Sequence, residues 1–140
     1  MAYVSIPTYS TTIPQRYALI GAKCESCGNV TFPPSEKCGC GSTEFERVRL
    51  SGRGKVYTYT IISRGSAPPE FSEQQRLVGD FAVAIVELEE GPKIIAQMTD
   101  CDPTEVKIGM DVEAVFRRIY EDEGIIRYGF KFKPILKKID

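Results

Sequence analysis

The feature that most constrains this chain is a cluster of four cysteines in one short stretch. Cys24 and Cys27 form a first close pair, and Cys38 and Cys40 form a second pair after ten intervening residues. Zinc in structural sites prefers four tetrahedral ligands, and cysteine thiolates are among its usual donors. The spacing therefore predicts one zinc ion bound by all four sulfurs. Four protein ligands leave no open position for water or substrate, so such a site would stabilise a fold and not run a reaction.

The second cysteine pair is irregular, because it is one residue shorter than the usual Cys-x-x-Cys turn. It can still chelate a metal, but its turn must differ from that of the first pair. Cys101, the fifth cysteine, is an alternative fourth ligand in place of Cys40, although it follows the third predicted strand of the barrel. Redox chemistry or a chance cluster would also account for four cysteines so close together. The odd number of cysteines argues against a disulfide framework.

Composition excludes several functional classes. The chain of 140 residues contains no histidine, which removes Ser-His-Asp and Cys-His catalysis and histidine metal ligands. A net charge of -1 gives no support for nucleic-acid binding, since such proteins usually carry a basic excess. The longest apolar run, around Phe81–Val86, is too short to cross a bilayer, and Met1–Ser10 lacks the pattern of a signal peptide. We expect a cytoplasmic protein that is not an enzyme.

The sequence beyond the cysteines has the alternation and the β-branched content of strands. We predict strands at Lys55–Ile62, Asp80–Leu88, Lys93–Met98, Asp111–Ile119 and Ile125–Phe132. Ser63–Gly79 is expected to be a long loop, and Cys101–Gly109 a connector with room for one helical turn. Five strands in this order suit a five-stranded OB-fold barrel, with an open sandwich as the alternative. The expected fold is mainly β.

We divide the chain into an N-terminal arm (residues 1–16), a rubredoxin-like zinc ribbon (residues 17–50) and an OB-fold barrel (residues 51–140). The arm is polar, is broken by Pro7 and Pro14, and shows no sustained helical period. Glu44–Leu50 alternates charged and apolar residues, as a strand leaving the ribbon would.

The last predicted strand separates aromatic from basic residues. Tyr128, Phe130 and Phe132 fall on one face by period two, and Arg127, Lys131 and Lys133 fall on the other. A single-stranded nucleic-acid platform needs aromatics and cations on the same exposed face. The separation therefore favours aromatics in the barrel core and cations in solvent. The basic face, together with Lys137 and Lys138, is a candidate contact for CoA phosphates or for an acidic partner surface.

Several motifs lie in an order that is similar to a known family. They are Pro14–Tyr17, Leu19–Gly21, Cys24 and Cys27 with Gly28, Phe32–Pro34, Cys38 and Cys40 with Gly41–Ser42, Gly54–Val56, Val86–Pro92, Ile108–Val112, and Tyr128–Phe130 through Pro134. On these residues the chain resembles the archaeal branch of the zinc-ribbon OB-fold proteins catalogued as domain of unknown function thirty-five. The resemblance covers nearly the whole chain, and the short second cysteine pair is its one clear departure.

The resemblance implies a function that the residues alone do not show. Family members accompany thiolase-like enzymes that act on acyl-CoA, and related ones join enoyl-CoA hydratases or aldolases. Archaeal members bridge acetoacetyl-CoA thiolase and 3-hydroxy-3-methylglutaryl-CoA synthase in the mevalonate pathway. The implied role is a non-catalytic scaffold of such a complex, with structural zinc and with the barrel bordering a CoA or acyl-CoA site. The alternatives are a single-stranded nucleic-acid-binding module and an enzyme that acts on acyl-CoA by itself.

Overall fold

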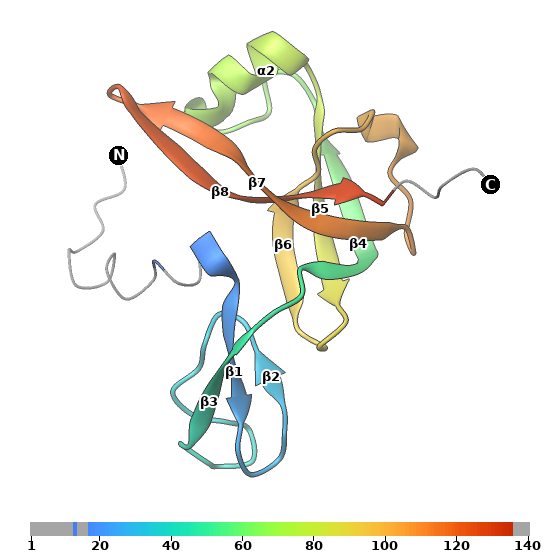
Figure 1. The fold of residues 1–140 in the computed structure, drawn as a ribbon. Coiled ribbons are helices and arrows are strands. Elements are labelled where there is room, and N and C mark those ends of the chain that lie inside the picture. The colour runs from blue at the N-terminus through green and yellow to red at the C-terminus, as the bar shows by residue number, and fades with distance from the viewer. Residues whose placement is uncertain (1–12, 14–16, 136–140) are drawn as a thin grey trace.

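The structure is a computed structural model that describes Ile13 and residues 17–135. Apart from Ile13, the predicted arm (residues 1–16) lies outside the described residues, as do Lys137 and Lys138. The described chain is mainly β, as predicted, and folds into a small sheet and a larger sheet (Figure 1). In chain order the elements are β1 (Ile20–Cys24), β2 (Val30–Thr31), β3 (Phe45–Arg49), β4 (Arg53–Ile62), the 3-10 helix η1 (Pro69–Phe71), α2 (Ser72–Val78), β5 (Phe81–Leu88), β6 (Lys93–Gln97), the 3-10 helix η2 (Pro103–Glu105), β7 (Asp111–Asp122) and β8 (Ile125–Pro134).

The small sheet has three short strands in the order β2-β1-β3. β1 is central and antiparallel to both neighbours. Gly21 allows a close approach of β2, because a Cβ atom at this position would lie 2.8 Å from the Thr31 carbonyl oxygen. β1 and β3 pair along their whole length, from Ile20 opposite Arg49 to Cys24 opposite Phe45. The chain therefore enters and leaves this sheet at the same end.

The larger sheet has five antiparallel strands in the order β6-β5-β4-β7-β8. β5 and β6 form a hairpin, in which the Gly91 N–H donates to the Leu88 carbonyl at 2.9 Å. Gly91 has a φ of 110°, which glycine adopts without steric cost. A parallel bridge between Met98 and Phe132 joins the end of β6 to β8. Because this bridge brings the two edges of the sheet together, the sheet forms the nearly closed five-stranded barrel that the sequence predicted.

One hydrophobic core serves both sheets. The side chains of Val56, Val86, Val112 and Phe132 fill the barrel, and each residue is at most 1% exposed. Leu19 and Leu50, which flank the small sheet, belong to the same buried cluster. Val30 and Val48 of the small sheet pack against it, as does Phe32, which follows β2. The Leu50 N–H also donates to the Leu19 carbonyl at 3.0 Å. The small sheet is therefore rooted in the barrel and packs as part of it.

The segment predicted as a loop over Ser63–Gly79 contains helix α2, so that prediction is wrong in part. α2 buries Gln75 and no apolar residue, which is why no helical apolar period marks it. The Gln75 side chain replaces apolar packing with hydrogen bonds: its Nε2 donates to the Ser63 carbonyl at 2.8 Å, and its Oε1 accepts from the Gly65 N–H at 3.2 Å. Gly79, with a φ of 77°, ends the helix. Within the described part of the chain, no helix is long and apolar enough to span a membrane.

The last strand departs from the predicted separation of aromatic and basic residues at two positions. Phe132 is fully buried as expected, but Tyr128 is 42% exposed. β7 and β8 extend to Asp122 and Ile125, beyond the barrel wall, and the described residues leave this part of the inward face largely uncovered. Lys131, expected in solvent, is only 7% exposed. It lies against α2, the element that the sequence pattern missed.

Candidate metal centre

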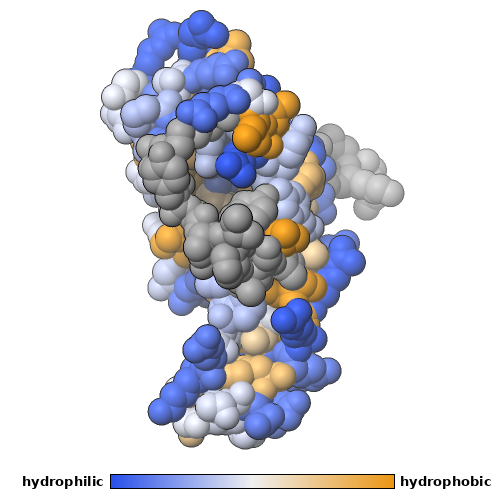
Figure 2. Space-filling model, turned by 90° about the vertical axis from the view of Figure 1, so that its left-hand side faces the viewer, coloured by the Kyte–Doolittle hydropathy of each residue, from blue (hydrophilic) through white to orange (hydrophobic). Residues whose placement is uncertain are grey.

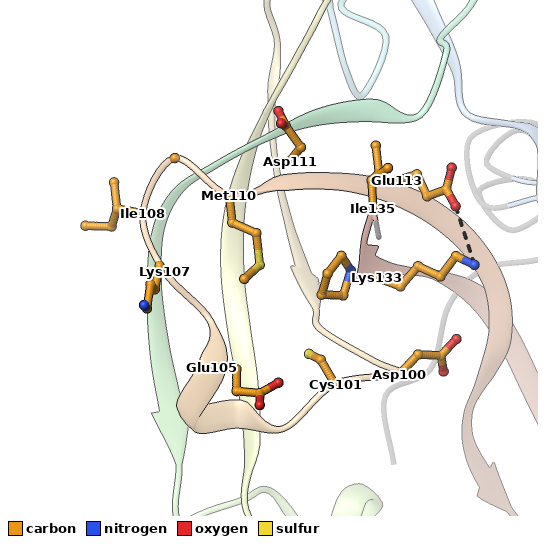
Figure 3. A pocket seen from close by; sticks show the side chains of 12 residues that line it. Asp100, Cys101, Glu105, Lys107, Ile108, Met110, Asp111, Glu113, Lys133 and Ile135 are labelled. Carbon is orange, nitrogen blue, oxygen red and sulfur yellow. Dashed lines mark ion pairs between the residues drawn. The ribbon is translucent and has the colours of Figure 1, made fainter. Parts of the chain in front are cut away.

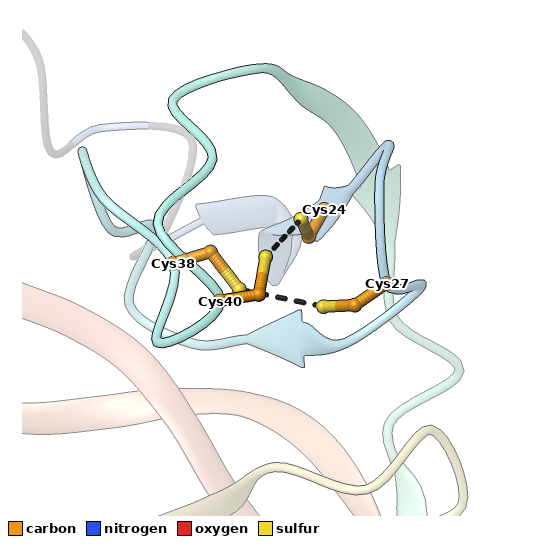
Figure 4. A group of neighbouring side chains, drawn as sticks. All are labelled: Cys24, Cys27, Cys38 and Cys40. Atoms are coloured by element: carbon orange, nitrogen blue, oxygen red, sulfur yellow. Dashed lines mark hydrogen bonds between the residues drawn. The ribbon is translucent and has the colours of Figure 1, made fainter.

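The four clustered cysteines meet at one point in the small sheet (Figure 4). All four Sγ atoms lie within 4.8 Å of one another. The contacts cross between the two pairs: Cys24 Sγ lies 3.6 Å from Cys40 Sγ, and Cys27 Sγ lies 3.4 Å from Cys38 Sγ. Cys24 and Cys38 are buried, whereas Cys27 and Cys40 are exposed. Each pair therefore supplies one inner and one outer sulfur.

The first pair is positioned by the end of β1. Cys24 is the last residue of this strand, and its N–H donates to the Asn29 carbonyl at 2.8 Å. The chain then turns, and the Gly28 N–H returns to the Cys24 carbonyl at 2.9 Å. Gly28 has a φ of 76°, in the region that favours glycine. This turn carries Cys27 back toward Cys24.

The second pair uses a tighter turn, which accounts for its shorter spacing. The Gly41 N–H donates to the Cys38 carbonyl at 2.9 Å, so this turn closes over three residues, whereas the first closes over four. Gly41 has a φ of 93°. The turn is anchored by the Cys38 N–H, which donates to the Ser42 carbonyl at 2.9 Å. The Cys38–Cys40 pair is one residue shorter than the Cys24–Cys27 pair, and its turn is also one residue shorter. Both pairs therefore direct their sulfurs to the same point.

The four sulfurs fit a zinc ion. At the usual Zn–S distance of about 2.3 Å, a tetrahedron has S–S edges of about 3.8 Å. The two shortest S–S distances, 3.4 and 3.6 Å, and the upper limit of 4.8 Å lie around that value. The donor set also suits zinc, because soft thiolates select zinc over magnesium or calcium. A bound zinc ion would cross-link the two turns, and the four sulfurs would leave it no position for substrate.

Hydrogen bonding gives the thiols different pKa values. The backbone N–H groups of Cys27 and Ser26 stabilise the Cys24 thiolate and lower its pKa to about 6. The Cys40 N–H has the same effect on Cys38, but hydrogen bonds with the Cys27 and Cys40 side chains, together with burial, outweigh it and raise the Cys38 pKa to about 12. Without a cation, the cluster ionises one thiol readily and resists ionisation of another. A divalent cation would remove this conflict, because it stabilises all four thiolates.

Cys101 does not belong to this group of sulfurs. It lies before η2, on the wall of an open hollow of about 970 Å³ on the barrel (Figure 3). Burial raises the pKa of its thiol, and Glu105 and Asp100 raise it further. Four carboxylates and two lysines line the hollow, and Lys133 is paired with Glu113 at 3.4 Å. The hollow is therefore unsuited to CoA phosphates.

An aromatic cluster at the surface was not expected from the sequence. Phe116 of β7 stacks on Tyr128 of β8, with ring centroids 5.7 Å apart and an interplanar angle of 16°. The Tyr17 ring packs against the Phe116 ring, with centroids 5.5 Å apart. All three remain at least 40% exposed. Figure 2 views the molecule from the left-hand side of Figure 1 and shows hydrophobic residues at the surface between hydrophilic ones. The register of the β7–β8 pair brings these rings together, and a single sequence does not give that register.

Comparison with protein families identifies both sheets. Residues 11–46 match a family model described as the rubredoxin-like zinc ribbon domain of ChsH2. Residues 47–117 match a second model, described as the C-terminal OB-fold domain of ChsH2. The two matches follow one another in the order of the small sheet and the barrel, and the first contains all four clustered cysteines.

Comparison with individual proteins gives relatives of three kinds. A DUF35 domain-containing scaffold protein of Methanocaldococcus jannaschii is 53% identical over 127 residues, which cover 88% of this chain and 86% of that protein. The benzoylsuccinyl-CoA thiolase subunit BbsA of Geobacter metallireducens is 38% identical over 80 residues, which cover 57% of this chain and 49% of that protein. The solved structure of an Ltp2-ChsH2(DUF35) aldolase has a TM-score of 0.68 at 24% identity, over 96% of this chain and 98% of that one, and shows the same fold.

Proposed function

Because this chain belongs to the DUF35 family, in which a ChsH2-type zinc ribbon precedes an OB-fold barrel, we propose that it is a non-catalytic scaffold subunit of an acyl-CoA condensing complex. The observation that carries the proposal is the placement of the metal centre. The four-thiol site lies at the end of β1, and the residue before β1, Leu19, is buried in the barrel core. Such a ribbon is a rigid extension of the barrel, and it can present a second docking surface.

The proposal assigns a role to each segment of the chain. Residues 1–16 are proposed as an arm, residues 17–50 as the ribbon and residues 51–140 as the barrel. Cys24, Cys27, Cys38 and Cys40 are the proposed zinc ligands. The zinc has a structural role, since it would hold the two turns together. The arm and the ribbon would dock the enzymes.

The proposed partner is a thiolase-type enzyme. Support comes from the similarity to a protein named as a thiolase subunit and from the scaffold name of the relative that is 53% identical. The finer proposal is a bridge between acetoacetyl-CoA thiolase and 3-hydroxy-3-methylglutaryl-CoA synthase, which feeds the mevalonate pathway in the cytoplasm. This bridge is a finer proposal than a thiolase-type partner, and it rests on the family resemblance of the sequence.

The barrel is further proposed to border a CoA site shared with the partner. An apolar hollow of about 420 Å³ supports this proposal, because it could cover the uncharged part of an acyl-CoA. Its lining includes Ile62, Phe71, Phe81, Val83, Ile95 and Phe130. The acidic lining of the hollow around Cys101 opposes CoA phosphates, so in this proposal the partner would bind them.

Affinity purification of the tagged chain from its native cell tests the proposal. We expect a thiolase-family enzyme to be recovered in fixed proportion to the chain. The purified chain alone should not turn over acetoacetyl-CoA. Recovery of the chain without any thiolase-family enzyme, or turnover by the isolated chain, would refute the scaffold proposal.

Single-stranded nucleic-acid binding is the second candidate, and the exposed stack of Phe116 on Tyr128 favours it. Two neighbouring cations on β7 weigh against it. Arg117 pairs with Asp100 at 2.9 Å, and Arg118 pairs with Glu121 at 2.8 Å, so neither is free for phosphate. Fluorescence anisotropy with a labelled single-stranded oligonucleotide decides between the two. Binding that weakens steeply with salt would favour this candidate.

A further inference from the structure

A groove runs along helix α2, which lies at the top of Figure 1, while the ribbon lies at the bottom. The groove consists of two adjoining hollows of about 160 and 210 Å³. One extends to the outer part of β7, and the other extends to the loop that follows β6. Gln74, Val78 and Lys131 line both hollows. These three residues therefore form the shared middle of the groove.

Lys131 lies in this groove as a largely buried cation. The residue is only 7% exposed, and it forms neither a hydrogen bond nor an ion pair with any described residue. Burial lowers the pKa of its ammonium group, and the nearby Asp100 carboxylate opposes the shift. Burying an unpaired charge is costly, so buried charges are normally paired or hydrogen-bonded. Lys131 thus provides hydrogen-bond donors that no described residue of this chain uses.

Gln74 provides an acceptor that is also unused. Its Nε2 donates to Gln97 Oε1 at 3.0 Å, while its own Oε1 is buried and has no hydrogen-bond partner in the part of the chain that the structure describes. Buried polar side-chain atoms in native structures are paired in the large majority of cases. Counting contacts with described residues only, the groove therefore offers a donor group, on Lys131, and an acceptor, on Gln74, that remain available to a ligand.

The other charges in the groove restrict what can bind there. Five carboxylates line the two hollows, against the two cations Arg118 and Lys131. Arg118 is already paired with Glu73 at 3.7 Å and with Glu121 at 2.8 Å. This excess of negative charge opposes polyanions such as nucleic acid or CoA phosphates. Leu77 and Val78, which are 71% and 65% exposed, form an apolar rim.

We propose that the groove along α2 binds an extended, uncharged or basic peptide segment of the partner subunit. In an extended segment, the N–H and C=O of one residue point to the same side. The carbonyl would accept from the Lys131 ammonium group, and the N–H would donate to Gln74 Oε1. An apolar side chain of the segment would cover Leu77 and Val78. Basic side chains of the segment would face the carboxylates on the rim.

The inference rests on the proposed function, because it names the surface on which the partner enzyme docks. The test begins with the wild-type chain, and the absence of a co-purifying enzyme at that step refutes the proposed function alone. With the purified enzyme, we expect Lys131→Met and Gln74→Leu each to raise the Kd by about tenfold to a hundredfold, which corresponds to the loss of a buried hydrogen bond. Lys107→Met, in the hollow around Cys101, is the matched control and should leave the Kd within about twofold of wild type.

The variants also separate docking from folding. Lys131→Met removes a largely buried charge that no described residue pairs, so this variant should unfold at the wild-type temperature or above it. Gln74→Leu also removes the Nε2 donor of the 3.0 Å hydrogen bond to Gln97, so this variant should unfold slightly below the wild-type temperature and remain folded under the binding conditions. If both fold and bind the partner with the wild-type Kd, the groove holds only trapped water and the inference is refuted.

A random peptide library selected on the zinc-loaded full chain gives a test that needs no enzyme. Basic, apolar peptides that lose binding on Lys131→Met support the inference. Selected peptides that bind this variant equally, or that inorganic tripolyphosphate displaces from the groove, refute it.

Discussion

Replacing Cys40 by serine removes one of the four sulfurs at the metal centre and leaves the rest of the ribbon unchanged. Cys40 is exposed and its Sγ contacts Cys24 Sγ at 3.6 Å, so the substitution creates no cavity in the core. Structural zinc binds small domains with roughly 10–16 kcal/mol, and we divide this free energy evenly among the four ligands. Loss of one ligand should therefore cost about 3 kcal/mol, or about a hundredfold in zinc affinity. The substitution should also lower the free energy of unfolding of the zinc-loaded chain.

The assay is a competition titration with a chromophoric chelator, combined with a metal count on the purified chain. Wild type should bind one zinc ion, and Cys40→Ser should release it to the chelator at about a hundredfold lower chelator concentration. Cys101→Ser is the matched control, because Cys101 lies on the barrel wall and outside the sulfur group. If Cys101→Ser lost zinc while Cys40→Ser kept wild-type affinity, the assignment of the fourth ligand would be wrong.

Three further predictions concern the fold. Leu50→Ala should lower the free energy of unfolding by about 2–5 kcal/mol in urea titrations followed by tyrosine fluorescence, because Leu50 is 4% exposed and joins the ribbon to the core. A loss below about 1 kcal/mol would show that the ribbon is not rooted there. Gly54→Ala should cost about 1–3 kcal/mol by the same measurement, because the new Cβ meets the Glu87 carbonyl oxygen and the Val86 side chain; wild-type stability would contradict the close approach. Lys131→Met should be more stable than wild type at neutral pH. Since burial lowers the Lys131 pKa in the folded state, wild-type stability rises with pH up to the ordinary lysine range, and the advantage of the variant should shrink over that interval. A constant difference would exclude Lys131 as the cause.

The metal centre could be predicted from spacing alone, because a close pair of cysteines needs only a local turn to direct its sulfurs to one point. Which sulfur contacts which across the two pairs could not be predicted. The contacts cross, from Cys24 to Cys40 and from Cys27 to Cys38, and this depends on how the two turns face each other. The tight second turn also explains why Cys38 and Cys40 can be closer in sequence without Cys101 taking part.

The barrel was predictable because its strands are long and rich in β-branched residues. Helix α2 was not, because it is anchored by the amide of Gln75 and not by an apolar stripe. That omission had a second effect: without α2, Lys131 was expected in solvent, whereas the helix buries it. Tyr128 was misplaced for the opposite reason, since periodicity assigns a side chain to a face but does not show where the opposing wall ends.

The pairing of β1 with β3 has a consequence for how such chains can change. The segments that enter and leave the small sheet lie side by side, and Leu19 and Leu50 join at its base through a 3.0 Å hydrogen bond. Residues 20–49 therefore form an insert whose two ends are already adjacent. Ribbons with other turn lengths or other surfaces fit this junction when they keep the apolar contacts that Val30, Phe32 and Val48 make with the barrel core. One barrel can in this way acquire new binding partners through replacement of a single continuous cassette.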